Sequence, residues 1–597
     1  MEHGVAAAVA SSTSLIEEGF NTLDHECAPI MDEHHDYLKT NETIQYTGSS
    51  GLTDCVVTNS YGAFPDRSIC KAAQAVFPST EEELLAFVAN VSKKQQKIRV
   101  VSKHSHSIPK LVCPEGDLGL IYSLSNLNHG VSLDETSMRI TVESGMGLKD
   151  LIDSAAEHGL ALPHSPYLLG VSVGGMLGTG AHGSSLFGKG SAVHEYVVGM
   201  RLVVPASQEE GYAKVATLTE QDMDLNAAKV SLGVLGVISQ VTFQLEAMFK
   251  RSITNVYKSD FNIENRIVKF RLEHEFADLT WYSSQYKVVC RVDDRLSINS
   301  SGNGVNDFIG FQPQSTALLA TTRAAEEAKE ATSNGEGKCI LSAIQVSTIL
   351  STGAGLKNNN LLFTGYPVIG YQNKMQSAGS CLTSSENGLL TSCAWDPRIK
   401  GLFFHQTGMS ISVSRISEFL SDVKKLRDMN PISKCGLELY SGILMRFVKA
   451  SSAHLGKEED SVDMDITYYR SNDPNTPRLY EDVFEEIEQM GFFKYGSLPH
   501  WGKNRNLAFD SVINKYSKSY EFLSAKNKYD PQGIFSSEWT DSLLGLRDKQ
   551  VTVLKDGCAL EGLCVCSKDA QCAPDRGYFC EAGRVYTDAR VCRGRES

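Results

Sequence analysis

Two side chains near the C-terminal third of the chain could act together in a reaction. His500 and Lys503 stand three residues apart in the run Leu498-Pro499-His500-Trp501-Gly502-Lys503. An imidazole can orient a reacting hydroxyl group or accept its proton, and a fixed ammonium stabilises negative charge that develops during a reaction. Trp501 suits either the wall of a flat ligand or a position in the core. The run is therefore a candidate catalytic segment.

A glycine-rich stretch from Leu169 to Gly183 is a candidate ligand cradle. Glycine permits positive φ and close backbone approach, so successive amides can converge on a phosphate or a flat ring. Tight turns between strands are the alternative interpretation. Polar side chains in and after the stretch favour a ligand, and the expected contacts are Ser172, Val173, Gly174, Gly175, Gly178, Thr179, His182 and Gly183.

A polar loop follows the apolar run from Ile98 to Val101. A serine hydroxyl at its end can donate to a phosphate, and its two histidines are further candidates for contact with a ligand. A surface loop without any ligand is the alternative. The loop consists of Ser102, Lys103, His104, Ser105, His106 and Ser107.

The elements that would position these segments predict an α+β arrangement. A capping box within 79–83 opens a helix, because a hydroxyl precedes a glutamate by three residues. A second helix runs from Leu148 to His158, with Gly159 after its end. No G-x-G-x-x-G follows the first strand, which disfavours a Rossmann fold. Strands are predicted at 98–101, 119–122, 138–143 and 234–242.

The pattern changes beyond Lys250. Strands are predicted at 253–257 and 288–292, and helices at 415–428 and 479–490. Between them lies a low-complexity stretch, 300–338, whose middle (317–331) could be helical and whose ends are typical of exposed loop.

Length and charge exclude several classes of protein. At 597 residues the chain is long enough for two or three domains. Its net charge is −14 and its basic residues are scattered, whereas a nucleic-acid groove needs clustered Lys and Arg. No stretch of about 18 apolar residues is present. We therefore expect neither a nucleic-acid partner nor a transmembrane segment.

Six of the fifteen cysteines lie in the last forty residues: Cys558, Cys564, Cys566, Cys572, Cys580 and Cys592. An even number in a short, glycine-rich tail predicts a unit stapled by disulfides, and hence an oxidising compartment. A zinc knuckle is the alternative, although only Cys564 and Cys566 are closely spaced. We predict no metal site.

The N-terminal region gives a weaker indication of where the protein acts. Residues 1–50 are polar and aperiodic, as in a loosely structured leader, and they lack the basic n-region of a signal peptide. The triplets that begin at Asn41, Asn90 and Asn299 are glycosylation sequons. Together with the cysteines they predict a secreted or endomembrane-lumenal protein, for which peripheral membrane association stays open.

Four segments resemble those of one flavoprotein family. The run from Val173 to Gly183 resembles the second flavin-binding segment of vanillyl-alcohol-oxidase type FAD domains. The run 232–238 resembles their closing strand, whose backbone, here at Val237 and Ile238, lies along the adenosine. The runs 498–503 and 529–535 are similar to motifs of aldonolactone oxidases. With the cysteine-rich tail, they identify the chain as similar to plant L-gulonolactone oxidase-like proteins.

This resemblance implies an α+β fold with three parts and a leader. A FAD-binding domain of vanillyl-alcohol-oxidase (PCMH) type would cover 51–250, a cap domain with an antiparallel sheet 251–548, and a disulfide tail 549–597, after a leader at 1–50. It also implies FAD as cofactor. His106 is the candidate for a covalent bond to the flavin, with His104 as the alternative.

The resemblance further implies oxidation of a sugar lactone such as L-gulono-1,4-lactone, leading to L-ascorbate, with oxygen or another electron acceptor. Lys503 would lie at the flavin edge, His500 at the reacting hydroxyl and Arg446 at the lactone oxygen. The family places a glutamate two residues before the arginine, where this chain has Leu444. Glu438 has the same parity, but it would lie about 26 Å from Arg446 along an extended strand. An alditol or other carbohydrate oxidase, and an extracellular binding protein without turnover, are therefore the alternatives.

Overall fold

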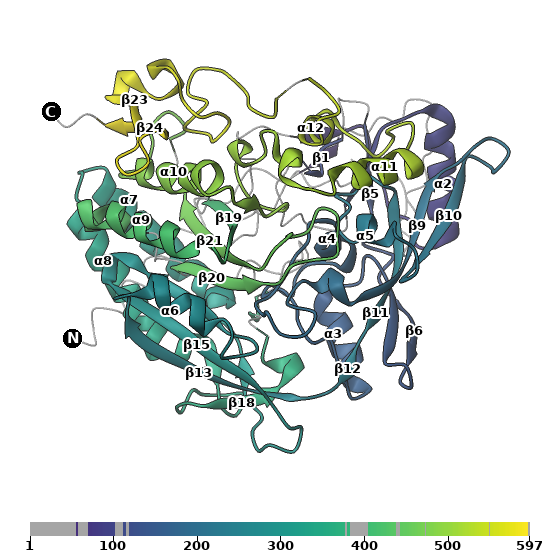
Figure 1. The fold of residues 1–597 in the computed structure, drawn as a ribbon, viewed down its shortest axis with the longest axis horizontal. Coiled ribbons are helices and arrows are strands. Elements are labelled where there is room, and N and C mark those ends of the chain that lie inside the picture. Colours follow the sequence, from purple (N-terminus) through teal and green to yellow (C-terminus); the bar gives the residue numbers. More distant parts are fainter. Residues whose placement is uncertain are drawn as a thin grey trace, which may run out of the picture.

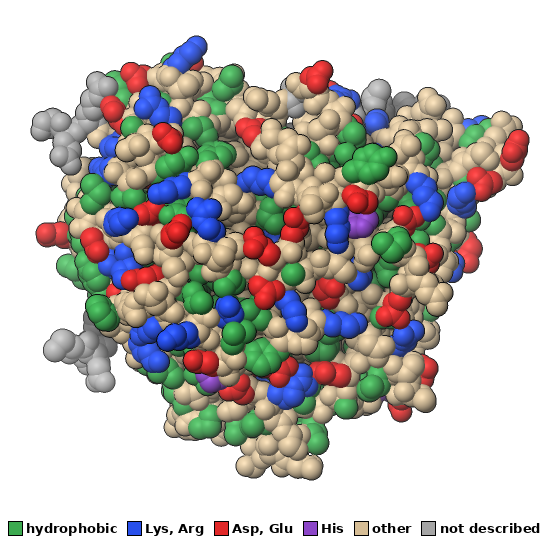
Figure 2. All heavy atoms as spheres, viewed as in Figure 1, with side chains coloured by type: hydrophobic (Ala, Val, Ile, Leu, Met, Phe, Trp, Pro, Cys, Tyr) green, Lys and Arg blue, Asp and Glu red, His purple; other side chains and the backbone are tan. Residues whose placement is uncertain are grey.

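The structure is a computed structural model. It describes residues 55–57, 70–101, 111–114, 119–376, 379–381, 404–436, 442–471, 473–548 and 550–594. Two sheet-containing halves lie side by side, and the C-terminal tail covers one end of the second half (Figure 1). Lys and Arg side chains are interspersed with Asp and Glu over the face in Figure 2. None of the helices in the described ranges is long and apolar enough to cross a membrane.

A small parallel sheet and a helix form the edge of the first half. Its strand order is β3 (Gln74–Val76), β5 (Leu120–Ser123) and β4 (Ile98–Val101). Thr80 is the N-cap of helix α2 (Glu81–Lys94), and its hydroxyl accepts a hydrogen bond from the amide of Glu83 at 3.1 Å. The Glu83 carboxylate accepts the amide of Ser79 at 2.8 Å. The predicted cap is therefore present, with the return bond made to the residue before the N-cap.

A five-stranded antiparallel sheet forms the centre of the first half. Its order is β10 (Ala213–Thr219), β9 (Val197–Pro205), β11 (Val237–Gln244), β7 (Arg139–Glu143) and β6 (Gly130–Asp134). In the chain, helix α3 (Leu148–Glu157) follows β7, and helix α4 (Val173–Gly178) comes before β9. Gly159 ends α3 with φ of +68°, as predicted from the sequence.

An eight-stranded sheet, antiparallel throughout, forms the second half. Its order is β18 (Val368–Tyr371), β13 (Lys250–Ser259), β15 (Lys287–Leu296), β14 (Asp278–Tyr282), β20 (Ile443–Val448), β21 (Ser461–Tyr469), β19 (Phe404–Ser412) and β22 (Leu498–Pro499). Helices α6 (Ile263–Phe270) and α9 (Ile416–Met429) pack on each other and bury apolar faces against it.

The low-complexity stretch is more helical than predicted. Helix α7 (Pro313–Glu330) contains the expected helix, but α8 (Gly335–Ser351) begins inside the part predicted to be exposed loop. The side chain of Asn334 caps α8 by accepting the amide of Gly337 at 2.7 Å. A disulfide joins Cys339 of α8 to Cys435. The prediction for this end of the stretch was wrong, because an asparagine cap and a distant cysteine stabilise a helix that starts at glycine.

The tail is stapled by disulfides, as predicted. Its six cysteines pair as Cys558–Cys564, Cys566–Cys580 and Cys572–Cys592. The last two bonds fasten β23 (Tyr578–Ala582) and β24 (Arg590–Gly594), which form a hairpin, to Cys566 and Cys572 earlier in the tail. The tail packs on α10 (Glu481–Gln489), as Figure 1 shows. The α+β class, the antiparallel cap sheet and the disulfide tail are thus confirmed.

Candidate active site

A cavity of about 670 Å³ lies between the two halves of the molecule. One wall comes from the first half and includes Gly174, Gly175 and Gly178 of α4. The opposite wall is one face of the eight-stranded sheet, with the loop that carries His500 and Lys503 beside it. The glycine-rich cradle and the candidate catalytic segment, more than 300 residues apart in the sequence, therefore line one space.

Strand register aligns the polar side chains of the sheet wall in rows. In one row, charges of opposite sign alternate across neighbouring strands, and a hydroxyl ends the series. This row runs Arg291, Asp278, Arg446, Asp463 and Ser410. The adjacent row, two residues along each strand, runs Val289, Thr280, Leu444, Asp465 and Gly408. Cross-strand neighbours on one face are close enough to interact directly.

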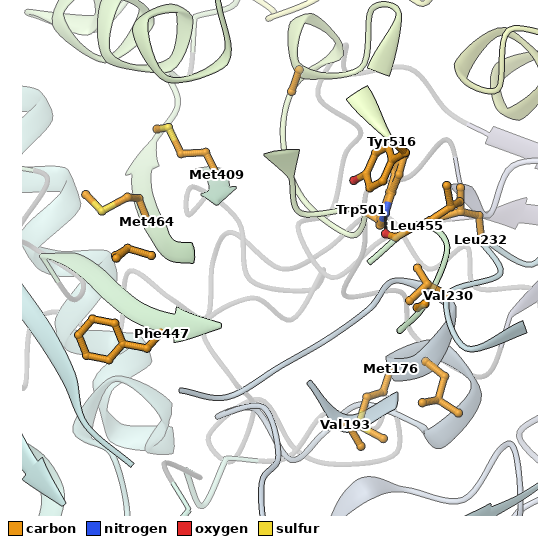
Figure 3. Packing of buried hydrophobic residues seen from close by; sticks show 14 of the residues in the cluster. Met176, Val193, Val230, Leu232, Met409, Phe447, Leu455, Met464, Trp501 and Tyr516 are labelled. Atoms are coloured by element: carbon orange, nitrogen blue, oxygen red, sulfur yellow. Dashed lines mark hydrogen bonds between the residues drawn. The ribbon is translucent and has the colours of Figure 1, made fainter. Parts of the chain in front are cut away.

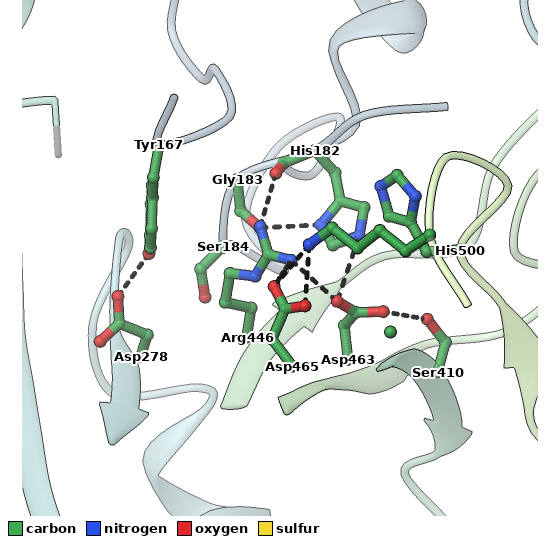
Figure 4. A network of polar contacts seen from close by, with 12 residues as sticks. Tyr167, His182, Gly183, Ser184, Asp278, Ser410, Arg446, Asp463, Asp465 and His500 are labelled. Atoms are coloured by element: carbon green, nitrogen blue, oxygen red, sulfur yellow. Dashed lines mark hydrogen bonds and ion pairs between the residues drawn. The ribbon is translucent and has the colours of Figure 1, made fainter. Parts of the chain in front are cut away.

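Arg446 lies at the centre of the buried polar network (Figure 4). Its guanidinium donates to Asp463 at 2.9 Å, to Asp465 at 2.7 Å and to the carbonyl of His182 at 3.0 Å. Although burial alone would lower it, the two carboxylates hold the pKa of Arg446 above its ordinary value. Its Nε–H has no hydrogen-bond partner among the described residues. Arg446 is thus a fixed cation held by two carboxylates and one carbonyl.

Lys503 reaches the same network from the opposite side. Its ammonium lies 2.8 Å from both carboxylate oxygens of Asp465. Burial lowers the pKa of Lys503, and the charge of Asp465 opposes that shift. The loop can approach β19 this closely because position 408 is glycine: a Cβ there would lie 2.9 Å from the Cβ of His500 and 3.2 Å from Cδ of Lys503.

His500 is held as a neutral hydrogen-bond donor. Its Nδ1 accepts the amide of Gly502 at 3.1 Å, so the proton of the neutral ring lies on Nε2. Burial lowers the pKa of His500 well below its ordinary value, and Lys503 adds to that shift. The two uses predicted for this imidazole were orienting a hydroxyl and accepting its proton, and this tautomer suits the first.

His182 lies beside His500, with ring centres 5.6 Å apart (Figure 4). Its Nδ1 is 3.0 Å from the carbonyl of Gly183 and so carries the proton. Its Nε2 has no hydrogen-bond partner in the described ranges and lies 3.5 Å from Asp463. Burial lowers the pKa of His182, while Asp463 acts against that shift. His182 therefore offers a free, buried lone pair beside a carboxylate.

Trp501 belongs to the core and not to the cavity wall. Its ring stacks on Tyr516 with 5.3 Å between ring centres, and its Nε1–H donates to the carbonyl of Leu455 at 2.9 Å (Figure 3). It is 3% exposed. Of the two roles open from the sequence, the structure supports the core position, which anchors the loop between His500 and Lys503.

Three family models match the chain in order. Residues 72–208 match a model described as FAD binding domain, residues 399–543 one described as D-arabinono-1,4-lactone oxidase, and residues 555–594 one described as L-gulonolactone oxidase 2-like, C-terminal domain. L-gulonolactone oxidase 2 of Arabidopsis thaliana is 57% identical over 545 residues, which are 91% of this chain and 92% of that protein.

The chain belongs to the L-gulonolactone oxidase family. L-gulonolactone oxidase 3 of Arabidopsis thaliana is 49% identical over 91% of the chain and 92% of its own length. L-gulonolactone oxidase of Mus musculus is 22% identical over 79% of the chain and 96% of its own length. A solvent-stable cholesterol oxidase shares the fold, with a TM-score of 0.62 at 14% identity, over 83% of this chain and 98% of that one. This family member is an FAD-dependent oxidoreductase.

The residues around the cavity fit FAD. A Cβ added at Gly178 would meet nothing within 4 Å, so this wall leaves open space for a ligand against bare backbone. On the opposite side, Arg446, Asp465 and Lys503 bring charged side chains to the cavity. The size of the cavity, the glycines in one wall and these charged side chains together suit a large, flat and polar cofactor.

The predicted cofactor contacts divide into three groups. Those that line the cavity are Ser172, Gly174, Gly175, Gly178, Thr179, His182 and Ile238. Val173 and Val237 are fully buried in the core, and Gly183 packs against the backbone of Ser165. The predicted loop, which includes both candidate attachment histidines, lies outside the described residues, as does Glu438.

The sequence did not point to several charged residues of the site. Asp278 lies 2.7 Å from Arg291 and accepts a hydrogen bond from the hydroxyl of Tyr167. Asp463 and Asp465 hold Arg446. For Asp463 and Asp465, the one signal in the sequence was the Asp-Met-Asp alternation, which places two carboxylates on one face of a strand.

Proposed function

We propose that this family member oxidises an aldonolactone, such as L-gulono-1,4-lactone, to a keto-lactone that leads to L-ascorbate. The observation that supports the proposal most is the joining of Arg446, Asp465 and Lys503 in a cavity whose other wall includes the glycines of α4. FAD, when bound, supplies a hydride acceptor for the carbon beside the lactone carbonyl. Oxygen or another acceptor would take the electrons afterwards.

The chain's own residues would bind and orient the substrate. Arg446, which lines the cavity, would hold the lactone oxygen through its guanidinium. His500, with its proton on Nε2, would donate to the oxygen of the reacting hydroxyl. Lys503 would lie beside the flavin edge, where a fixed ammonium favours negative charge.

The proton of the reacting hydroxyl needs an acceptor other than His500. Nε2 of His182 has no hydrogen-bond partner in the part of the chain that the structure describes, and Asp463 at 3.5 Å would stabilise a proton there. We therefore assign proton uptake to His182 and orientation to His500. This division follows from the two ring tautomers, which are fixed by the amide of Gly502 and the carbonyl of Gly183.

Leu444 supports a second candidate function. It lies on the sheet wall between Thr280 and Asp465, where a leucine offers no hydrogen bond to a polar substrate. An alditol or another carbohydrate would therefore suit this wall as well as a lactone. A binding protein without turnover remains the third alternative from the sequence.

Steady-state turnover separates these candidates. The purified protein is assayed with L-gulono-1,4-lactone, L-galactono-1,4-lactone and xylitol, and flavin bleaching is followed without oxygen. We expect a lactone to give the highest kcat/KM. Preference for xylitol would support the carbohydrate oxidase instead, and an unbleached flavin with all three would support the binding protein.

Covalent attachment through His106 stays a prediction. Acid precipitation tests it: a yellow pellet that turns white in His106→Ala supports the bond. If the pellet stays yellow in His106→Ala but not in His104→Ala, the attachment site is His104.

Secretion or lumenal residence is proposed on two features. The four disulfides that join Cys339 to Cys435 and the tail cysteines in pairs indicate an oxidising compartment. Asn299, in one sequon, is exposed in the loop after β15, where a glycan could be attached. A mass shift after treatment with an endoglycosidase would test the second feature.

A further inference from the structure

Asp465 joins the two cations of the site. Both of its oxygens lie 2.8 Å from the ammonium of Lys503, and one also accepts from Arg446 at 2.7 Å. The side chain is 9% exposed and lines the cavity. Because Lys503 is a flexible side chain on a loop, this carboxylate fixes where its ammonium lies.

The strand register makes Asp465 the source of negative charge in its row. The cross-strand positions on either side are Leu444 and Gly408, and the next two along the row are Thr280 and Val289. All four are uncharged. The carboxylate therefore faces the cavity without a competing cation from its own row, and it is neutralised from the adjacent row and from the loop.

We propose that Asp465 is a positioning residue that sets the reduction potential of the bound flavin. It holds Lys503 in place and at the same time offsets part of its positive charge. A negative charge at a cofactor that gains electrons disfavours reduction, and a positive charge favours it. The inference rests on the proposed placement of Lys503 beside the flavin, and it does not depend on which lactone is oxidised.

The first test compares two single variants of the FAD-loaded protein. Asp465→Asn keeps the shape of the side chain and one oxygen that can accept from Lys503, but removes the negative charge, so the flavin potential should rise. Lys503→Met should lower it. We expect each substitution to change the equilibrium constant for flavin reduction about tenfold, which for a two-electron couple is a shift of about 30 mV in potential. The potential is measured by reduction in the presence of a reference dye, without substrate.

The second test moves the carboxylate across the strand pair. Residues directly opposite each other have Cβ atoms about 5 Å apart, so Leu444→Glu places a carboxylate beside the same cavity. As a single change it should lower the potential. In Leu444→Glu with Asp465→Asn, the potential should return toward that of the unchanged protein. A merely structural role for Asp465 predicts no such rescue.

The matched control is Asp294→Asn. It removes an acid from the same sheet, but at the end of β15, where Asp294 pairs with His274 and its side chain is 43% exposed. The potential should not move. This variant separates a local effect of Asp465 from a change in net charge.

Different outcomes would overturn different claims. If Lys503→Met leaves the potential unchanged, the placement of Lys503 beside the flavin is wrong. If Lys503→Met lowers the potential but neither Asp465→Asn nor Leu444→Glu moves it, the role of Asp465 is wrong while the proposed function stands. If Asp465→Asn does not retain FAD, the potential of Leu444→Glu tests the proposal instead, because that variant keeps Asp465. A lower potential would support the proposal and a higher one would contradict it.

Discussion

The geometry of this site depends on the absence of a side chain at Gly408. The amide of His500 donates to the carbonyl of Gly408 at 2.9 Å, and the side chain of Asn504 bonds both the amide and the carbonyl of the same glycine. These contacts fasten the catalytic loop to β19. They leave no room for a side chain, because a Cβ would approach the Cβ of His500 to 2.9 Å.

Gly408→Ala should therefore displace the loop and slow the reaction. A shift of about 1 Å in a catalytic group can cost about 100-fold in rate, so we expect a loss of that order in kcat/KM with FAD still bound. Gly130→Ala is the control, because a Cβ there meets nothing within 4 Å. Steady-state kinetics and flavin absorbance measure both. Full activity in Gly408→Ala would show that the loop tolerates a shift.

The sequence identified residues whose local pattern is distinctive and missed those defined by strand register. His500, Lys503 and Arg446 were predicted from short motifs, and the structure joins Lys503 to Arg446 through Asp465, with His500 and His182 lining the same cavity. Asp465 has no signal in the sequence beyond the Asp-Met-Asp alternation. Its importance comes from lying opposite Leu444 and Gly408, and pairing between strands distant in sequence cannot be read from either strand alone.

At the scale of elements, α10 shows how a buried acidic helix holds the tail. One oxygen of Glu486 accepts the amides of Val585 and Tyr586, and the other accepts that of Arg584. Glu485 accepts the amide of Cys592 at 2.9 Å. Burial raises the pKa of Glu485 to about 8. The helix thus presents one carboxyl group that is neutral over part of the physiological range.

This shift predicts a pH-dependent stability with a definite sign. Because the folded pKa of about 8 lies above the ordinary value of 4.5, the contribution is fully present below pH 4.5 and is lost as the pH rises through 8. Glu485→Gln stays neutral and keeps the bond to Cys592, so it should stabilise the protein relative to the unchanged chain near pH 8 and hardly at pH 5.

Thermal unfolding across that range measures the difference. Glu418→Gln, on the exposed face of α9, serves as the control, since its side chain is 67% exposed. A constant difference between Glu485→Gln and the unchanged protein at every pH would contradict the assignment.

Elements with a strong local signal were predicted well, and those that depend on distant contacts were not. The strand at Ile98–Val101 was predicted with its observed bounds, and α3 and α9 to within one residue at either end. Helix α8 was missed, because its stretch is rich in glycine, serine and threonine and its helical form depends on Asn334 and on the bond from Cys339 to Cys435.

At the scale of the whole molecule, the tail is coupled to the catalytic loop. Arg505, two residues after Lys503, forms an ion pair with Glu488 of α10 and lies 3.8 Å from Glu485 of the same helix. The amide of Asn506 donates to the carbonyl of Gly562 in the tail at 3.1 Å. Gly562 also lies against Arg505, because a Cβ there would collide with that side chain. The tail therefore supports the loop from the side away from the cavity.

Removing one tail disulfide should accordingly affect catalysis, and removing another should not. Cys558–Cys564 closes the short segment that contains Gly562, whereas Cys566–Cys580 fastens the outer hairpin. Each bond contributes on the order of 2–3 kcal/mol by constraining the unfolded chain, so both double Cys→Ala variants should unfold at lower temperature. Only Cys558→Ala with Cys564→Ala should also lower kcat/KM, by about tenfold, because Gly562 then moves away from Asn506 and Arg505. Equal kcat/KM values in the two variants would show that the tail stabilises the fold without supporting the catalytic loop. A selective loss would show that a unit with no cavity residue of its own holds Lys503 in its working position.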